Sequence, residues 1–255
     1  MNPEVFLTLF QLAVLAAVLL AALRLLSAAR GALRIVFFCF AVACLLFSDL
    51  YWLAYGLLRP ETRMPFAANE ICEWSSFLLL GAALKAAPPA RSVSARWEML
   101  GAALFTAACT ALWIAWSGEW LQDLLTGLCF GWFLVRLAAR MKGNGTLSRR
   151  AWRLAGLICT VLAAAQAATF FVPETVSAAL DLCCYGLLFA GNAFLLTKAV
   201  LALRRGEDVC PAFLAFAWTI TTLYMSSGTY YLAAVLLSTL CFPLMLLALR
   251  KEAAA

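Results

Sequence analysis

Apolar residues occur along this chain in nine long runs that are separated by short polar segments. A helix needs about 20 consecutive apolar residues to cross a bilayer. The pattern therefore predicts an all-α polytopic integral membrane protein, with one transmembrane helical-bundle domain over residues 1–255. The predicted spans are 5–26, 34–58, 66–86, 97–117, 119–140, 151–172, 175–198, 210–226 and 229–249.

Composition limits what such a chain can do outside the membrane. Hydrophobic residues make up 65% of the 255 and charged residues 13%. Nine spans of about 20 residues use roughly 180 positions, so the loops are too short for a soluble catalytic or nucleotide-binding domain. The chain has no histidine, which removes haem ligation, zinc–histidine sites and histidine-based catalytic dyads. We expect no cofactor and no metal site.

Basic residues predict the orientation of the bundle. Of the nineteen Lys and Arg residues, all but Arg59 and Arg63 fall in alternate gaps between the apolar runs. Loops rich in Lys and Arg stay on the cytoplasmic side, so the N-terminus is expected outside and the C-terminus in the cytoplasm. We expect a bacterial-type inner (plasma) membrane.

The formal charge of +6 is then explained by topology next to anionic lipid. The expected partner is the lipid bilayer, and nucleic acid is not expected. The basic segment 136–153 is a candidate docking surface for a cytoplasmic or membrane protein.

Two features bear on packing inside the bundle. Gly127 and Gly131 form a G-x-x-x-G pattern in the fifth span, which permits close approach of a neighbouring helix. We expect that neighbour to belong to the same bundle. For the eighth segment to cross the membrane fully, Ser226-Ser227-Gly228 has to form a tight external turn.

Acidic residues gather on the predicted external side, and Asp49 lies deepest in an apolar run. It precedes Arg59 by ten residues, roughly 15 Å along a helix at about 1.5 Å per residue. Carboxylates at such depth usually face a bundle interior, a partner or a water-filled cavity. Trp52 follows within one turn, and a carboxylate with an indole suits a desolvated cation. A neutral carboxylic acid bonded to a neighbouring helix, with Trp52 as core filling, is the structural alternative.

The third span begins with a second acidic group. Glu70 and Glu73 lie one helical turn apart, and Trp74 follows directly. The short connection at 60–65 predicts that spans two and three form an antiparallel hairpin, which would bring Asp49 and Glu73 to similar depth. Two carboxylates placed close together share a proton or hold a cation between them. Glu70 can alternatively lie in the headgroup layer.

The seventh span carries a further polar stripe. Asp181, Tyr185 and Asn192 fall near one helical face, and Gln166 of the sixth span lies at a depth comparable to that of Asp181. A ligand site and a set of interhelical hydrogen bonds both fit this pattern.

These residues favour an outward-opening acidic and aromatic site for a small cationic or amphipathic ligand or ion. The candidate ligand-binding residues are Asp49, Trp52, Glu70, Glu73, Trp74, Asp181, Tyr185 and Asn192. A transporter and a membrane sensor both fit such a site, and a structural subunit of a membrane complex is a further alternative.

Two short segments suggest an enzyme instead. Leu-Leu-Phe-Ser-Asp at 45–49 and Leu-Leu-Phe-Ala-Gly-Asn at 187–192 resemble the lysoplasmalogenase family, membrane hydrolases with paired intramembrane aspartates. The resemblance implies an intramembrane lipid hydrolase, in which Asp49 and Asp181 would activate water. It covers only these segments. The chain has more predicted spans than that family and lacks its Lys-Pro and His features.

Overall fold

The computed structural model describes residues 3–28, 33–59, 68–86, 94–146, 148–206, 209–224 and 226–254. These residues form nine helices and no strand. The helices are α1 (Pro3–Ala28), α2 (Leu33–Leu58), α3 (Ala68–Ala86), α4 (Arg96–Ser117), α5 (Trp120–Asn144), α6 (Arg149–Ala168), α7 (Glu174–Arg205), α8 (Cys210–Leu223) and α9 (Gly228–Ala254). The predicted all-helical fold is confirmed, with one helix for each predicted span.

Helix boundaries follow local chemistry. The side chain of Ser148 caps α6 by accepting a hydrogen bond from the backbone N–H of Ala151 at 3.2 Å. Gly145 ends α5 in the left-handed conformation, with φ of 67°, which a residue without a side chain adopts at little cost. Helix α7 continues to Arg205, beyond the predicted end at residue 198, because charged residues end an apolar span without ending a helix.

Within the described part of the chain, six helices are long and apolar enough to cross a membrane: α1, α2, α4, α5, α7 and α9. Many large apolar side chains are exposed on the outside of the bundle, including Phe40, Leu104 and Leu128. Soluble monomers rarely expose apolar surface on this scale. Both features are typical of a helical membrane protein.

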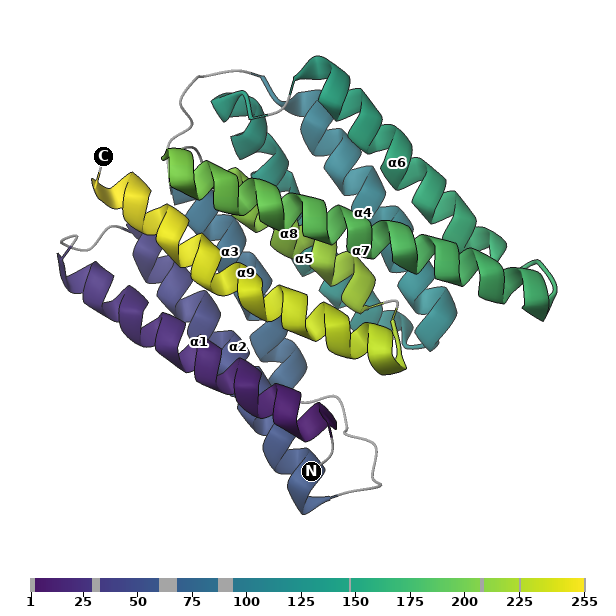
Figure 1. The fold of residues 1–255 in the computed structure, drawn as a ribbon, viewed down its shortest axis with the longest axis horizontal. Coiled ribbons are helices and arrows are strands. Elements are labelled where there is room, and N and C mark those ends of the chain that lie inside the picture. The colour runs from purple at the N-terminus through teal and green to yellow at the C-terminus, as the bar shows by residue number, and fades with distance from the viewer. Residues whose placement is uncertain are drawn as a thin grey trace.

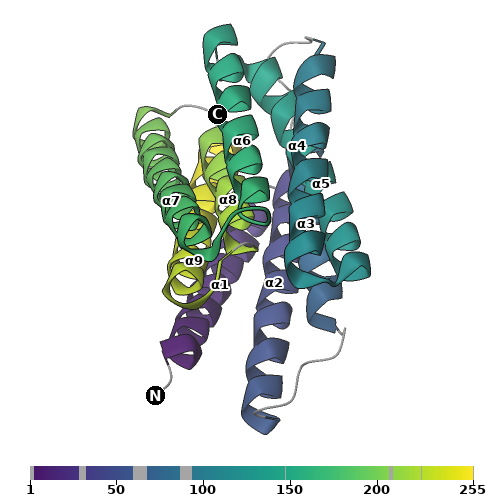
Figure 2. The ribbon, with the colours of Figure 1, turned by 90° about the vertical axis from the view of Figure 1, so that its right-hand side faces the viewer.

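The helices form two layers. One contains α2, α3, α5 and α4, and the other contains α1, α9, α8 and α7, with α6 at the edge between α4 and α7 (Figures 1 and 2). Helix α8 is short and central, packed against α5, α7 and α9. The layers also meet where α1 packs on α2.

The glycines of α5 allow one close contact within a layer. A Cβ atom on Gly127 would lie 1.9 Å from Thr110 Oγ1, and one on Gly131 would lie 3.1 Å from Thr106 Cγ2. Any side chain at Gly127 would therefore push α4 away from α5. The predicted close approach within the bundle is confirmed.

The core is a cluster of aromatic rings between the two layers. Phe77 of α3, Phe130 and Phe133 of α5, and Phe216 of α8 are at most 2% exposed. Neighbouring rings in this cluster lie 5.5–6.3 Å apart, as in the pairs Phe77–Phe130 and Phe77–Phe216. Such tilted and edge-on arrangements are favoured by the ring quadrupoles. The cluster holds the layers together near the middle of the molecule.

Candidate functional site

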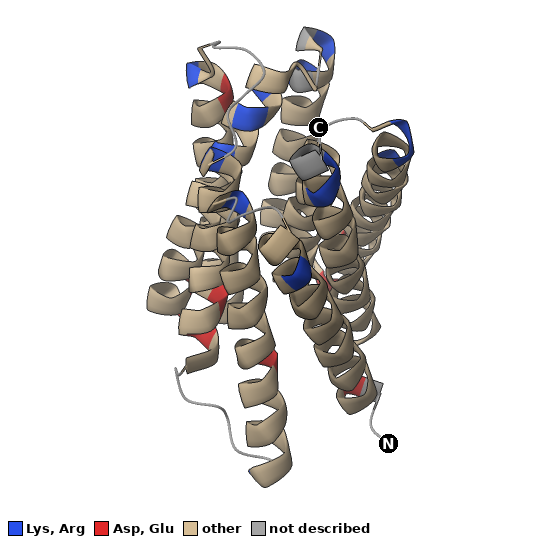
Figure 3. Ribbon diagram, turned by 90° about the vertical axis from the view of Figure 1, so that its left-hand side faces the viewer, with Lys and Arg blue, Asp and Glu red and all other residues tan. Residues whose placement is uncertain are grey.

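A cavity of about 240 Å³ lies between the two layers. Five helices line it: α1, α2, α3, α8 and α9. It takes in the start of α1, the last turns of α2 and the first turns of α3, so it lies toward the end of the bundle where the chain begins (Figure 1). Lys and Arg gather at the opposite end, and most Asp and Glu lie at or toward the cavity end (Figure 3).

Helices α2 and α3 form the acidic wall of the cavity. Asp49 and Trp52 of α2 and Glu73 of α3 all line it. The Ser48 hydroxyl donates a hydrogen bond to the backbone carbonyl of Asn69 at 3.1 Å, which ties the end of α2 to the start of α3. This contact joins α2 and α3 as the antiparallel hairpin predicted from the short connection. The hairpin brings Asp49, Trp52 and Glu73 together at one cavity.

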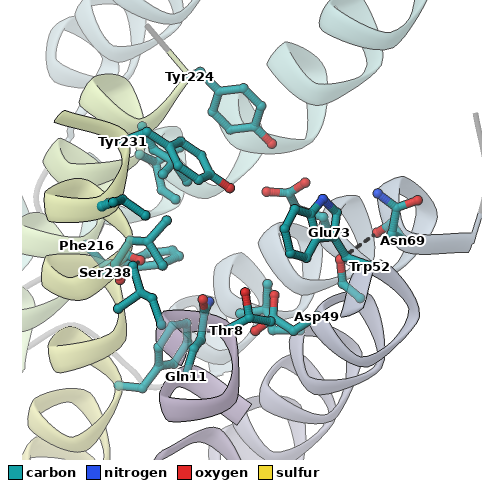
Figure 4. Close-up of a pocket in the computed structure, with 18 of the residues that line it drawn as sticks. Thr8, Gln11, Asp49, Trp52, Asn69, Glu73, Phe216, Tyr224, Tyr231 and Ser238 are labelled. Carbon is teal, nitrogen blue, oxygen red and sulfur yellow. Dashed lines mark hydrogen bonds between the residues drawn. The ribbon is translucent and has the colours of Figure 1, made fainter. Parts of the chain in front are cut away.

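Helix α1 supplies a polar strip that the sequence argument missed. Glu4, Thr8 and Gln11 line the cavity, at spacings of four and three residues that place them on one helical face. They are the only polar residues of α1 before Arg24. Figure 4 shows Asp49 pointing across the cavity toward α1, where Thr8 and Gln11 lie. Their spacing in an apolar run was the signal that could have found them.

Two tyrosines complete the lining from the opposite layer. Tyr224 follows the end of α8 and Tyr231 lies in the first turn of α9. Their hydroxyl groups point toward the Glu73 carboxylate (Figure 4). No local sequence pattern places these tyrosines at the cavity, because they reach it only through the packing of distant helices.

Two buried polar atoms at this cavity, Asp49 Oδ2 and Asn69 Oδ1, have no hydrogen-bond partner among the described residues. The buried Tyr224 hydroxyl comes from a third segment of the chain and interacts with Glu73. Buried polar atoms are normally satisfied by protein or by a bound molecule. Their convergence on one cavity indicates a place built to receive a polar group.

Among the described residues of the lining, the charged ones are all acidic: Glu4, Asp49 and Glu73. Trp52 adds an indole to the same wall. A carboxylate-lined, partly apolar cavity attracts cations and repels anions.

Two other predicted site residues in α3 lie outside this cavity. The Trp74 indole N–H donates to Thr126 Oγ1 of α5 at 2.8 Å, so this side chain joins α3 to α5. Glu70 is buried, with 7% of its surface exposed, and does not line the cavity. One turn of helix thus separates Glu73, which lines the cavity, from Glu70, which packs within the protein.

The polar stripe of α7 also lies apart from the cavity. Asn192 is fully buried and accepts a hydrogen bond from Thr219 Oγ1 of α8 at 3.1 Å. Tyr185 stacks on Tyr230 of α9, with 4.5 Å between ring centroids. Asp181 is half-buried and is not among the cavity-lining residues. The structure therefore does not bring this stripe to Asp49 and Glu73.

Gln166, which the sequence placed at the depth of Asp181, lines a separate small cavity with Cys109 and Trp218. That cavity has a volume of about 30 Å³, far below the roughly 150 Å³ that holds benzene. It is too small for an organic ligand.

The described part of the chain was also considered for a metal-binding site. Among those residues, no three His, Cys, Asp or Glu side chains come together in a way that could hold a metal ion.

Comparison with known proteins identifies no relative of this chain. The sequence matches no protein-family model, no curated protein and no solved structure. The function must therefore be inferred from the cavity and its lining.

Proposed function

We propose that this chain is a multi-pass protein of the inner (plasma) membrane that binds a small cationic ligand in the cavity between its two layers. In this proposal all nine helices cross the bilayer, with the N-terminus outside and the C-terminus in the cytoplasm. The cavity then opens to the outside. The observation that carries the proposal is the convergence of two carboxylates, Asp49 and Glu73, on one cavity, where Asp49 Oδ2 and Asn69 Oδ1 are buried without a partner among the described residues.

The distribution of basic residues supports the orientation. In the described part of the chain, every Lys and Arg except Arg59 belongs to the end of the bundle opposite the cavity (Figure 3). Such residues are retained on the cytoplasmic side. Arg63 lies outside the described residues.

Helix α8 is the shortest of the proposed spans. Its 14 residues extend about 21 Å at about 1.5 Å per residue, less than the roughly 30 Å hydrocarbon core. Most of its residues are buried, and α5, α7 and α9 surround it. A short span is tolerated where protein rather than lipid covers its ends.

The site serves a transporter or a sensor. Phe77 and Phe216 line the inner part of the cavity and belong to the aromatic core, so a ligand would pass to the cytoplasm only if this core opened. A sensor would instead signal through its cytoplasmic face. In the basic segment 136–153, Lys142 pairs with Glu98 at 2.5 Å and Arg136 lies over the Trp132 ring, whereas Arg150 and Arg153 are exposed. The exposed pair is the part of that segment suited to a partner.

The paired-aspartate hydrolase needs a different arrangement. Asp49 and Asp181 would have to activate one water molecule between them, and Asp181 does not line the cavity that holds Asp49. The geometry favours ligand binding over hydrolysis.

Matched pairs of amines and carboxylic acids with the same carbon skeleton test the proposal. Amines are expected to raise the melting temperature of the purified protein, and the corresponding acids are not. Glu73→Gln should remove the shift, because it deletes a charge in the cavity. Asp181→Asn should retain it and is the matched control, since this carboxylate lies elsewhere in the outer half of the bundle.

Stabilisation by the acids alone would overturn the proposal. Arg59 and Arg63 would then become the residues to study. Proteoliposomes loaded with the amine that binds best would next separate transport from sensing, because only a transporter moves the amine across the bilayer.

A further inference from the structure

The lining of the cavity changes from polar to apolar with depth, and three helices show the same gradient. Along α3 the lining residues are Asn69, Glu73 and Phe77, each one turn further from the acidic end. Asn69 and Phe77 are eight residues apart, about 12 Å at about 1.5 Å per residue.

Helices α8 and α9 repeat this order from the opposite layer. Along α8, Tyr224 is followed inward by Ile220 and Phe216. Along α9, Tyr231 is followed inward by Val235, by the small polar residue Ser238 and finally by Phe242. The cavity therefore has a polar entrance and an apolar floor.

The floor is formed by rings that already hold one another in place. Phe216 lies 6.3 Å from Phe77 and 5.1 Å from Phe242, between ring centroids. All three are at most 2% exposed. A preformed apolar surface of this kind binds an apolar group without first having to be ordered.

The volume limits the size of the occupant. A cavity of about 150 Å³ is enough to hold benzene, and this one has about 240 Å³. The remaining space accommodates a short chain that carries a charged group to the entrance. An inorganic cation would leave the floor unused.

We propose that the ligand is a primary amine bearing an aromatic or similarly compact apolar group. The ammonium group lies beside Asp49 and Glu73, and the apolar group rests on Phe77, Phe216 and Phe242. This inference rests on the proposed cation-binding function and adds the second half of the ligand. Tyr224 and Asn69 supply the polar atoms around the ammonium group.

Two probes separate this inference from the proposal beneath it. Methylammonium carries the charge alone, whereas 2-phenylethylamine carries the same charge with an aromatic group. Isothermal titration of the purified full-length protein is expected to show at least about tenfold tighter binding of 2-phenylethylamine, because burial of the ring adds about 25 cal/mol for each Å² removed from water.

Ser238→Leu tests the floor itself. Ser238 lines the cavity from α9, and its hydroxyl donates only to the Val235 carbonyl of its own helix at 2.8 Å. A leucine there fills space beside the floor without removing a contact between helices. It should weaken 2-phenylethylamine by about tenfold and leave methylammonium binding unchanged. Glu73→Gln should weaken both.

The outcomes are distinguishable. If both amines bind equally well and both depend on Glu73, the aromatic-amine inference is wrong and the cation site stands. Equal loss of both amines in Ser238→Leu would also overturn the inference, since the floor would then not be a separate subsite. If neither amine binds the parent protein, both proposals are wrong.

Discussion

Charged side chains have different surroundings at the two ends of this bundle. At the basic end, Lys142 pairs with Glu98 at 2.5 Å and Arg136 lies 4.0 Å from the centroid of the Trp132 ring. At the acidic end, Asp49 and Glu73 line a cavity of about 240 Å³. Asp49 Oδ2 is buried there without a hydrogen-bond partner in the protein.

The difference shows which charges need a functional explanation. In the proposed topology, basic residues near helix ends are explained by orientation in the membrane and by local pairs such as Lys142 with Glu98. Orientation does not explain carboxylates buried beside a cavity, because acidic residues contribute little to topology and their burial is costly. The acidic end is therefore where we expect ligand chemistry, and the basic end where we expect anchoring.

The largest expected effect concerns which end faces outward. Single cysteines introduced at Glu61 and Glu119 in a cysteine-free variant should react with an impermeant thiol reagent added to intact cells. Cysteines at Ser92 and Asn144 should react only after the membrane is permeabilised. The result is all or none, because charged reagents do not cross the bilayer. Labelling of the Asn144 position in intact cells would reverse the two ends and overturn the proposed topology.

Acidification should weaken ligand binding at the acidic end. The titratable groups facing the cavity are Glu4 from α1, Asp49 from α2, Glu73 from α3, Tyr224 from the end of α8 and Tyr231 from α9. Carboxylates take up protons as pH falls and lose the charge that attracts a cation. For 2-phenylethylamine, whose ammonium group stays protonated over this range, affinity should fall by about tenfold between about pH 8 and about pH 4.

Titration calorimetry across this range gives the measurement. The double variant Asp49→Asn, Glu73→Gln should show weak binding with a much flatter pH profile. An unchanged slope in that variant would mean that other groups control affinity.

A comparison of Trp52 with Trp120 separates the effect of an aromatic side chain in the cavity from that of one on the surface. Trp52 lines the cavity, whereas Trp120 at the same end of the molecule is 62% exposed. A desolvated cation–π contact contributes about 1–2 kcal/mol, so Trp52→Ala should lower amine affinity by about fivefold or more. Trp120→Ala should change it by less than about twofold. Equal effects would assign Trp52 to packing alone.

The sequence located the helices well because the signal is local. Each apolar run is long, and the polar breaks between runs match the helix ends within a few residues in most cases. The largest difference is in α7, which continues to Arg205. Hydropathy reports where lipid contact ends, and hydrogen bonding continues the helix beyond that point.

The site was only partly predictable, for the opposite reason. Asp49 and Trp52 were singled out by their depth in an apolar run, and Glu73 because a short connection makes α2 and α3 neighbours. Tyr224 and Tyr231 reach the cavity through contacts between distant helices, which no local pattern reveals. The stripe on α7 looked equally promising, yet Asn192 bonds to Thr219. A polar residue in an apolar run predicts that it needs a partner, and only the tertiary packing decides whether that partner is a helix or a cavity.

The smallest expected effect compares one charge pair from each end by double-mutant cycles. Asp49 and Glu73 carry like charges on one cavity, so neutralising either relieves repulsion and the second substitution adds less. Glu98 and Lys142 attract each other, so removing either already loses the contact. The coupling free energies, measured by unfolding in detergent, should therefore have opposite signs, each of about 0.5 kcal/mol. Asp49→Asn and Glu73→Gln are each expected to raise stability, since binding sites often retain groups that destabilise the fold. Additive behaviour of Asp49 and Glu73 beside measurable coupling of Glu98 and Lys142 would show that the two carboxylates do not share a site.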